Sequence, residues 1–203
     1  MSTILSLLGS PSARSRSGTL LAQLEARLAL ALDDGHAVVR LALRELPAEA
    51  LLRGDGSDRA IAGAVAAVRD ARLLLIATPI YKAAYSGLLK TFLDLLPLDA
   101  LRGKTIVPLA TGGSSAHLLA LDYALKPVLA ALGARDIRDA VYASDAQLPP
   151  DGASYAPVHE LNERLDRVLA DLLAPRAELL PGRRAPPGPR ASAVELAALR
   201  CPA

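Results

Sequence analysis

An uncharged apolar run in the first half of the chain constrains the fold most strongly. Residues 73–76 read Leu-Leu-Leu-Ile, which has the length of a strand and the composition of one buried on both faces of a parallel sheet. Thr78 and Pro79 follow, and we expect sheet pairing to end there because proline has no N–H to donate. After a loop, residues 88–96 have the apolar spacing of an amphipathic helix. In open α/β sheets, ligands bind at loops of this kind.

The same order of strand, loop and helix recurs along the chain. We expect strands at residues 3–8, 36–43, 72–77, 104–110 and 136–142. We expect helices at residues 19–32, with Ser17 as N-cap, and at 58–70, 88–96, 116–132 and 158–173. Strands that alternate with helices form parallel sheets. The sequence therefore predicts an α/β, flavodoxin-like, doubly wound five-stranded parallel sheet of order 2-1-3-4-5, with helices on both faces.

Composition and charge set the organisation of the chain and exclude several classes. Of 203 residues, 52% are hydrophobic, which predicts one domain, over residues 1–174, with a sizeable core. Residues 175–203 are rich in Pro and Arg and are expected to form a flexible tail. A net charge of +2 does not indicate a nucleic-acid or membrane partner, and no apolar run approaches the ~20 residues of a membrane helix. The single Cys201 excludes an internal disulfide and the Cys/His pattern of a metal site, which favours the reducing cytoplasm.

The loop after the first expected strand is rich in hydrogen-bond donors. Residues 10–17 contain four serines and two arginines just before a helix. A helix N-terminus favours an anion, so this loop predicts a site for a monophosphate. It has neither a Walker A lysine nor a G-x-G-x-x-G pattern. A solvated Ser/Arg turn with an ordinary N-cap is the alternative.

Two further loops lie at the ends of neighbouring expected strands. Tyr81, within residues 79–86, is placed to flank a flat ring, and Gly112-Gly113 lets backbone N–H groups approach a ligand closely. Such groups can stabilise negative charge on a reduced flavin. An exposed aromatic and a plain turn are the alternatives. No Ser-His-Asp order or carboxylate pair is present, and we predict no catalytic side chain, because hydride transfer through a flavin depends on orientation and electrostatics.

Several motifs together resemble a known family. The loop over residues 9–17, Thr78-Pro79-Ile80-Tyr81 and Thr111-Gly112-Gly113 resemble the NAD(P)H-dependent FMN reductases, a family of flavodoxin-like proteins. The runs at residues 81–87 and 116–129 are similar to the FMN reductases of bacterial two-component alkanesulfonate monooxygenase systems. The resemblance covers about residues 3–173.

The resemblance implies an activity and a set of binding residues. NADPH or NADH would pass hydride to FMN, and the reduced FMN would leave for a partner monooxygenase that desulfonates alkanesulfonates. FMN would thus act as a substrate more than as a fixed cofactor. The FMN phosphate would be held by Ser10, Arg14, Ser15 and Ser17. The isoalloxazine would be lined by Pro79, Ile80, Tyr81 and Lys82, with its pyrimidine end, or the nicotinamide cofactor, at Thr111, Gly112 and Gly113.

Tyr123 lies four residues before a proline in an expected helix. Pro127 predicts a kink or a lost hydrogen bond, and inserted residues that form π-bulges often mark functional sites. The resemblance implies that Tyr123 is such an insertion at a tetramer interface, so we expect a homo-oligomer, a dimer or a tetramer, in which Tyr123 reaches a neighbouring subunit's flavin site. A core tyrosine beside a kink is the alternative.

Other functions share this fold. A quinone or azo-dye reductase would hold FMN tightly. A flavodoxin-like electron carrier would transfer electrons but catalyse no reaction, and an interaction protein would bind no FMN at all. The choice between NADPH and NADH also stays open. Arg14 and Arg16 suit either the 2′-phosphate of NADPH or the phosphate of FMN.

Overall fold

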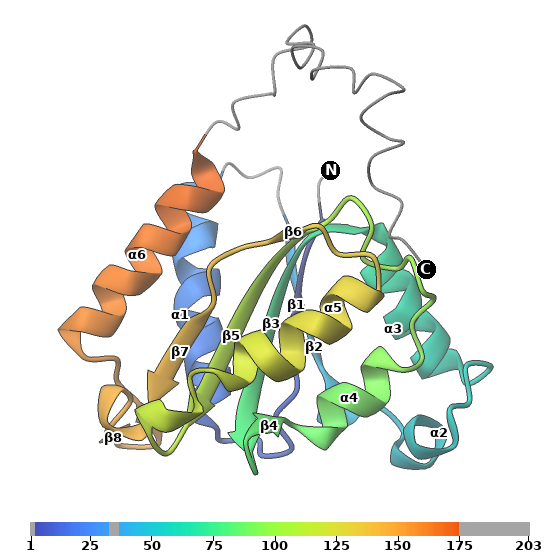
Figure 1. The fold of residues 1–203 in the computed structure, drawn as a ribbon, viewed down its shortest axis with the longest axis horizontal. Coiled ribbons are helices and arrows are strands. Elements are labelled where there is room, and N and C mark those ends of the chain that lie inside the picture. The colour runs from blue at the N-terminus through green and yellow to red at the C-terminus, as the bar shows by residue number, and fades with distance from the viewer. Residues whose placement is uncertain (1–2, 33–36, 175–203) are drawn as a thin grey trace, which may run out of the picture. The chain divides into compact units, whose positions relative to one another are not determined.

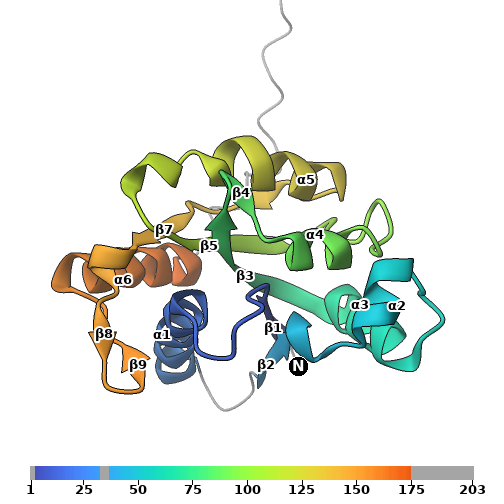
Figure 2. The same ribbon diagram turned by 90° about the horizontal axis from the view of Figure 1, so that it is seen from below.

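The computed structural model describes residues 3–32 and 37–174, in which a parallel sheet lies between two layers of helices (Figures 1 and 2). The sheet contains β1 (Thr3–Leu8), β2 (Ala37–Ala42), β3 (Ala71–Tyr81), β5 (Thr105–Gly112), β6 (Asp136–Ile137) and β7 (Val141–Ser144). Its order is β2-β1-β3-β5, with β6 and β7 both on the outer side of β5. This confirms the predicted order 2-1-3-4-5. The expected flexible tail at 175–203 lies outside the described residues.

The helices cover both faces of the sheet (Figure 2). One face packs against α1 (Arg16–Ala31) and α6 (His159–Leu173). The other packs against α2 (Ala48–Arg53), α3 (Arg59–Asp70), α4 (Gly87–Leu93) and α5 (Lys126–Ala131). Two short hairpin elements are also present: β4 (Ala84–Tyr85), antiparallel to β3, and the pair β8 (Pro150–Asp151) and β9 (Ser154–Tyr155).

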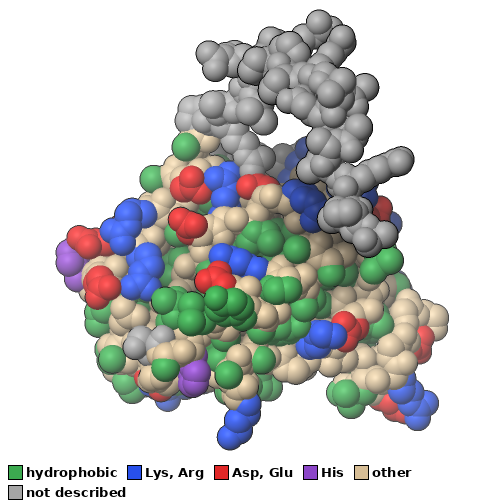
Figure 3. Space-filling view, in the orientation of Figure 1, with side chains coloured by type: hydrophobic (Ala, Val, Ile, Leu, Met, Phe, Trp, Pro, Cys, Tyr) green, Lys and Arg blue, Asp and Glu red, His purple; other side chains and the backbone are tan. Residues whose placement is uncertain are grey.

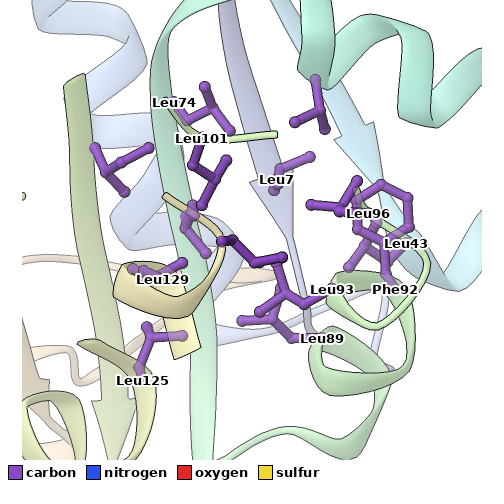
Figure 4. Close-up of a cluster of buried hydrophobic side chains, with 14 of the residues drawn as sticks. Leu7, Leu43, Leu74, Leu89, Phe92, Leu93, Leu96, Leu101, Leu125 and Leu129 are labelled. Carbon is purple, nitrogen blue, oxygen red and sulfur yellow. The ribbon is translucent and has the colours of Figure 1, made fainter. Parts of the chain in front are cut away.

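Two hydrophobic clusters hold the sheet between its helices. Side chains alternate along a strand, so Leu74 and Ile76 of β3 join the cluster with Phe92 and Leu129 (Figure 4), whereas Leu75 joins the cluster on the other face. Burial on both faces explains why this strand carries no charge in its centre. Among the described residues, no helix is both long and apolar enough to cross a membrane.

The prediction that pairing ends at Thr78 and Pro79 is wrong. Strand β3 continues to Tyr81, and Pro79 is aligned with Thr111 of β5. The ladder between β1 and β3 ends at Ala77. Pro79 therefore lies where β3 has a neighbouring strand on one side only, a position at which the missing N–H is tolerated. The sequence alone did not show that β1 stops pairing with β3 before Pro79.

The single strand expected at residues 136–142 is also wrong in detail. Two short strands, β6 and β7, occupy this range and pair with β5 before and after Pro108. Pro108 has no N–H for a neighbour on that side, which accounts for the break. It remains aligned with Ile76 of β3 on the other side.

Two helix predictions also need correction, and one helix was missed. Helix α1 begins at Arg16 with Ser15 as its N-cap, and Ser17 is buried within its first turn. Helix α2 was not predicted, and it lies between the strand expected at 36–43 and the helix expected at 58–70. The long helix expected at 116–132 is divided into a 3₁₀ turn (Ser115–His117), a π-helix (Leu121–Leu125) and α5.

Candidate functional site

A cavity of about 410 Å³ opens at the carboxyl ends of β1, β3 and β5. It brings together ten of the eleven residues that the sequence predicted to bind a ligand, and Lys82 is the exception. The ten are Ser10, Arg14, Ser15, Ser17, Pro79, Ile80, Tyr81, Thr111, Gly112 and Gly113. Ser12, Arg16, Asp145 and Tyr155 also line it. The cavity therefore joins three loops that lie far apart in the sequence.

The loop between β1 and α1 presents hydroxyls and the start of a helix to this cavity. Ser15 caps α1 by accepting a hydrogen bond from the N–H of Gly18 at 3.1 Å. The hydroxyl of Ser17 lies 2.7 Å from that of Thr111, which connects α1 with β5. Ser10 is buried and accepts a 3.3 Å bond from the N–H of Ser12. The N–H groups of Arg16 and Ser17 have no acceptor within the helix and favour an anion.

Both arginines of this loop contact Tyr155, a residue that the sequence analysis missed. The guanidinium carbons of Arg14 and Arg16 lie 5.2 and 4.6 Å from the centre of its ring. Arg14 also donates hydrogen bonds to the carbonyl oxygens of Gly152 and Ser154, at 2.9 and 3.3 Å. Hairpin β8–β9 therefore holds Arg14 in place, and cation–π contact adds to this restraint.

Arg16 is held by a second set of groups beside the hairpin. Its Nε donates to the carbonyl oxygen of Leu148 at 2.9 Å, and its Nη1 lies 3.4 Å from Oδ1 of Asp145. The sequence did contain a signal for this hairpin, because Asp151-Gly152 lies between two short extended segments. Gly152 has a φ of 52°, the left-handed conformation expected at the first position of such a turn.

Ser86 fixes the loop after β3 against the loop after β1. Its hydroxyl donates to the carbonyl oxygen of Gly9 at 2.5 Å and accepts from the N–H of Leu89 at 3.1 Å. A Cβ at Gly9 would lie 2.8 Å from Cβ of Leu89, so only glycine allows this approach. Thr78 accepts a 3.0 Å bond from the N–H of Ser86. These contacts hold the walls of the cavity in a fixed relation.

Lys82 lies away from the cavity at the tip of hairpin β3–β4. Lys82 and Ala83 form its two-residue turn with φ angles of 50° and 63°. Two consecutive left-handed residues are typical of a type I′ turn. The turn leaves Lys82 exposed, whereas Tyr81 both lines the cavity and is 51% exposed.

Gly112 and Tyr142 form the wall at the end of β5. A Cβ at Gly112 would lie 2.5 Å from the hydroxyl oxygen of Tyr142, whereas a Cβ at Gly113 would meet no atom within 4 Å. The Tyr142 hydroxyl donates a 2.5 Å hydrogen bond to the carbonyl oxygen of Ser114. Burial raises the pKa of Tyr142, and the charge of Asp145 raises it further, so the hydroxyl keeps its proton.

The π-helix lies beside the site and confirms the predicted bulge. Tyr123 is at its centre and is 78% exposed, so it is not a core tyrosine. Leu118 and Leu119, in the preceding turn, are also exposed. Figure 3 shows hydrophobic side chains gathered on this face of the molecule. Tyr123 does not line the cavity of its own subunit.

A family model and two similar proteins point to the same activity. The family model described as NADPH-dependent FMN reductase matches residues 2–148. A protein named FMN reductase (NADPH) from Pseudomonas putida KT2440 is 46% identical over 164 residues, 80% of this chain and 82% of the relative. A protein of the same name from Escherichia coli K12 is 48% identical over 146 residues, 71% of this chain and 74% of the relative.

A solved structure is similar in fold and in sequence. The apo form of an NADH:FMN oxidoreductase (EMOB) superposes with a TM-score of 0.73 and is 40% identical. The match covers 87% of this chain and 92% of that one.

Proposed function

The chain belongs to the NADPH-dependent FMN reductase family and is an NAD(P)H-dependent FMN oxidoreductase, and from this premise we propose that the cavity at the ends of β1, β3 and β5 binds FMN. The observation that carries the proposal is the convergence of ten predicted residues on one cavity of about 410 Å³, a size suited to a single small ligand. Bound there, FMN would supply the two-electron chemistry that accepts hydride from the nicotinamide.

The donor set of the cavity fits a phosphate at one end and a flat ring at the other. Ser10, Ser17 and the first turn of α1 would bind the phosphate, since the N–H groups of Arg16 and Ser17 have no acceptor within this 16-residue helix. Tyr81 and the backbone of Gly112 and Gly113 would flank the ring. Gly113 suits this role because the space beside its Cα is open. These residues bind and orient, and no side chain is assigned to proton transfer.

We also propose that FMN binds as an exchangeable substrate. The guanidiniums of Arg14 and Arg16 are engaged by the carbonyl oxygens of Gly152, Ser154 and Leu148 and by the carboxylate of Asp145. A phosphate would then depend mainly on neutral hydroxyls and amides, which form weaker hydrogen bonds than free guanidiniums. Weak binding of the phosphate favours release of the reduced flavin.

Release of reduced FMN would serve a partner monooxygenase, and we propose an alkanesulfonate-desulfonating one. The support is the likeness of residues 81–87 and 116–129 to the reductases of such two-component systems. We place this exchange in the cytoplasm, which suits a chain whose one cysteine, Cys201, cannot form an internal disulfide.

We further propose a homo-oligomer built through the face around the π-helix. Leu118, Leu119 and Tyr123 are 48%, 56% and 78% exposed there. Adjacent exposed apolar side chains of this kind mark interaction surfaces. The π-helix places Tyr123 outward, in a position to reach a neighbouring subunit's flavin site.

The deciding experiment is steady-state oxidation of NADPH by flavin-free protein, with and without added FMN. We expect a rate that saturates with FMN. Protein that retains FMN through purification and needs a quinone or azo dye as acceptor would support a tightly bound cofactor instead. No turnover with any acceptor would contradict the assigned chemistry and leave a flavodoxin-like electron carrier or binding protein.

A further inference from the structure

A second cavity, of about 600 Å³, adjoins the proposed FMN cavity on the side of β2. Its walls come from α1, the end of β2, the 3₁₀ turn Leu43–Glu45 and hairpin β8–β9, which lie on one side of the molecule in Figure 2. Arg14, Ser15 and Tyr155 line both cavities. One ligand can therefore extend from the first cavity into the second.

Arginines dominate the charge of this second cavity. Arg14, Arg40 and Arg44 line it, together with one carboxylate, Glu45. Arg40 is paired with Glu25 through Nε, at 3.0 Å, and through Nη2. The three arginines carry three positive charges, and Glu45 and Glu25 together carry two negative charges. The balance favours an anion.

Arg44 is the arginine most available to a ligand. Its Nη2 contacts Glu45 at 2.7 Å, but Glu45 is 67% exposed, and such surface pairs contribute little. Its Nη1 has no hydrogen-bond partner among the residues described but is itself buried, so Nη2 is the atom that would meet a ligand in place of Glu45. By contrast, Arg14 and Arg16 are held by carbonyl oxygens and by Tyr155. A phosphate can thus replace Glu45 at Arg44 without breaking a buried network.

We propose that the second cavity binds the adenosine half of NADPH, with Arg44 contacting the 2′-phosphate and Arg40 adding positive charge. The inference rests on the proposed function, because the nicotinamide must meet the flavin in the first cavity. FMN would occupy most of that cavity of about 410 Å³, so the adenosine half of the dinucleotide must lie beyond it. The second cavity is contiguous, basic and large enough for a nucleotide. A guanidinium also matches the geometry of a phosphate dianion.

This assignment makes Arg44 a determinant of the preference for NADPH over NADH. The relatives' names include both cofactors, so family membership alone does not decide the preference. NADH has a neutral hydroxyl where NADPH has the 2′-phosphate, and only the phosphate dianion forms an ion pair with Arg44.

Binding of nucleotide fragments to the full-length, flavin-free protein tests the proposal directly. Calorimetry would compare 2′,5′-ADP with 5′-ADP in the wild type, in Arg44→Gln and in Arg53→Gln. Arg53 is a matched control, since it is exposed on α2 in a surface pair with Glu49. We expect Arg44→Gln to weaken 2′,5′-ADP about tenfold or more, as for loss of a charged hydrogen bond, with little change for 5′-ADP. Arg53→Gln should bind both like the wild type.

Kinetics provide the second readout. For Arg44→Gln, the ratio of kcat/KM for NADPH to that for NADH should fall about tenfold. Wild-type protein that does not distinguish 2′,5′-ADP from 5′-ADP would overturn the proposal. So would a variant in which FMN binding weakens as much as 2′,5′-ADP binding, since the cavity would then hold the flavin phosphate.

The same data separate this proposal from the proposed function. Arg44-dependent binding of 2′,5′-ADP by a protein that reduces no FMN would contradict the function and leave the nucleotide site standing. FMN-saturable NADPH oxidation with no effect of Arg44→Gln on either readout would contradict the nucleotide site alone.

Discussion

Among single residues, Gly112 must be a glycine because the Tyr142 hydroxyl occupies the space that a Cβ would need. We expect Gly112→Ala to destabilise the protein by about 1–3 kcal/mol, because the added methyl would lie 2.5 Å from the Tyr142 hydroxyl oxygen. Movement of Tyr142 or of the β5 end to relieve this contact should also displace the cavity wall and weaken FMN binding. Chemical denaturation and FMN titration would measure the two effects.

A second substitution tests whether the hydroxyl is the cause. Tyr142→Phe removes the clashing oxygen, and the next atom of the ring is 3.4 Å away. The double variant should therefore recover part of the stability lost in Gly112→Ala. Gly113→Ala is the matched control and should change stability by less than about 0.5 kcal/mol, since nothing lies within 4 Å. Equal losses for both glycines would show that the contact with Tyr142 is not responsible.

At the scale of elements, the π-helix depends on one extra residue before Pro127. The N–H of Lys126 bonds to the carbonyl oxygen of Leu121, five residues back, and Pro127 has no N–H with which to restore the α-helical pattern. We expect deletion of Tyr123 to return this segment to α-helix and remove the exposed ring. The proposed oligomer should then dissociate, which sedimentation would detect, and FMN exchange should change with it.

Two variants separate the ring from the bulge. Tyr123→Ala keeps the extra residue and removes the ring, so it should weaken the oligomer less than the deletion does. Leu30→Ala is the control, because Leu30 is 90% exposed on α1, away from this face. If both Tyr123 variants kept the wild-type mass and FMN exchange rate, the proposed role of the π-helix would be wrong.

At the scale of the whole described domain, the sequence predicted the order of the sheet and most of the cavity, because both follow from local patterns. Ser10, Tyr81 and Gly112 each lie just beyond an apolar run, and the ends of parallel strands meet at one edge. The unpredicted parts depend on neighbours far away in the sequence. Pro79 is tolerated in β3 because β1 ends early, and Tyr155 reaches the cavity because a late hairpin folds against Arg14 and Arg16.

The domain is predicted to end at Ala174. We expect a chain ending at Ala174 to fold and to reduce FMN as the full chain does. In α6, Leu161, Leu165 and Val168 supply the buried side chains that cover one face of the sheet. The family match ends earlier still, at residue 148. Thermal melting and FMN-dependent NADPH oxidation would compare the shortened and full-length chains.

A chain ending at Val158 is the informative control for that boundary. It lacks α6, so Leu24 and Leu75 in the same cluster lose their cover, and each large side chain that α6 no longer buries removes about 1.5–3 kcal/mol of burial energy. A typical domain has a free energy of unfolding of only about 5–15 kcal/mol. Several such losses would exceed it, so this chain should not fold. Activity in the chain ending at Ala174 and none in the one ending at Val158 would place the boundary between them. Loss of activity in both would mean that residues 175–203 are needed, contrary to the predicted domain.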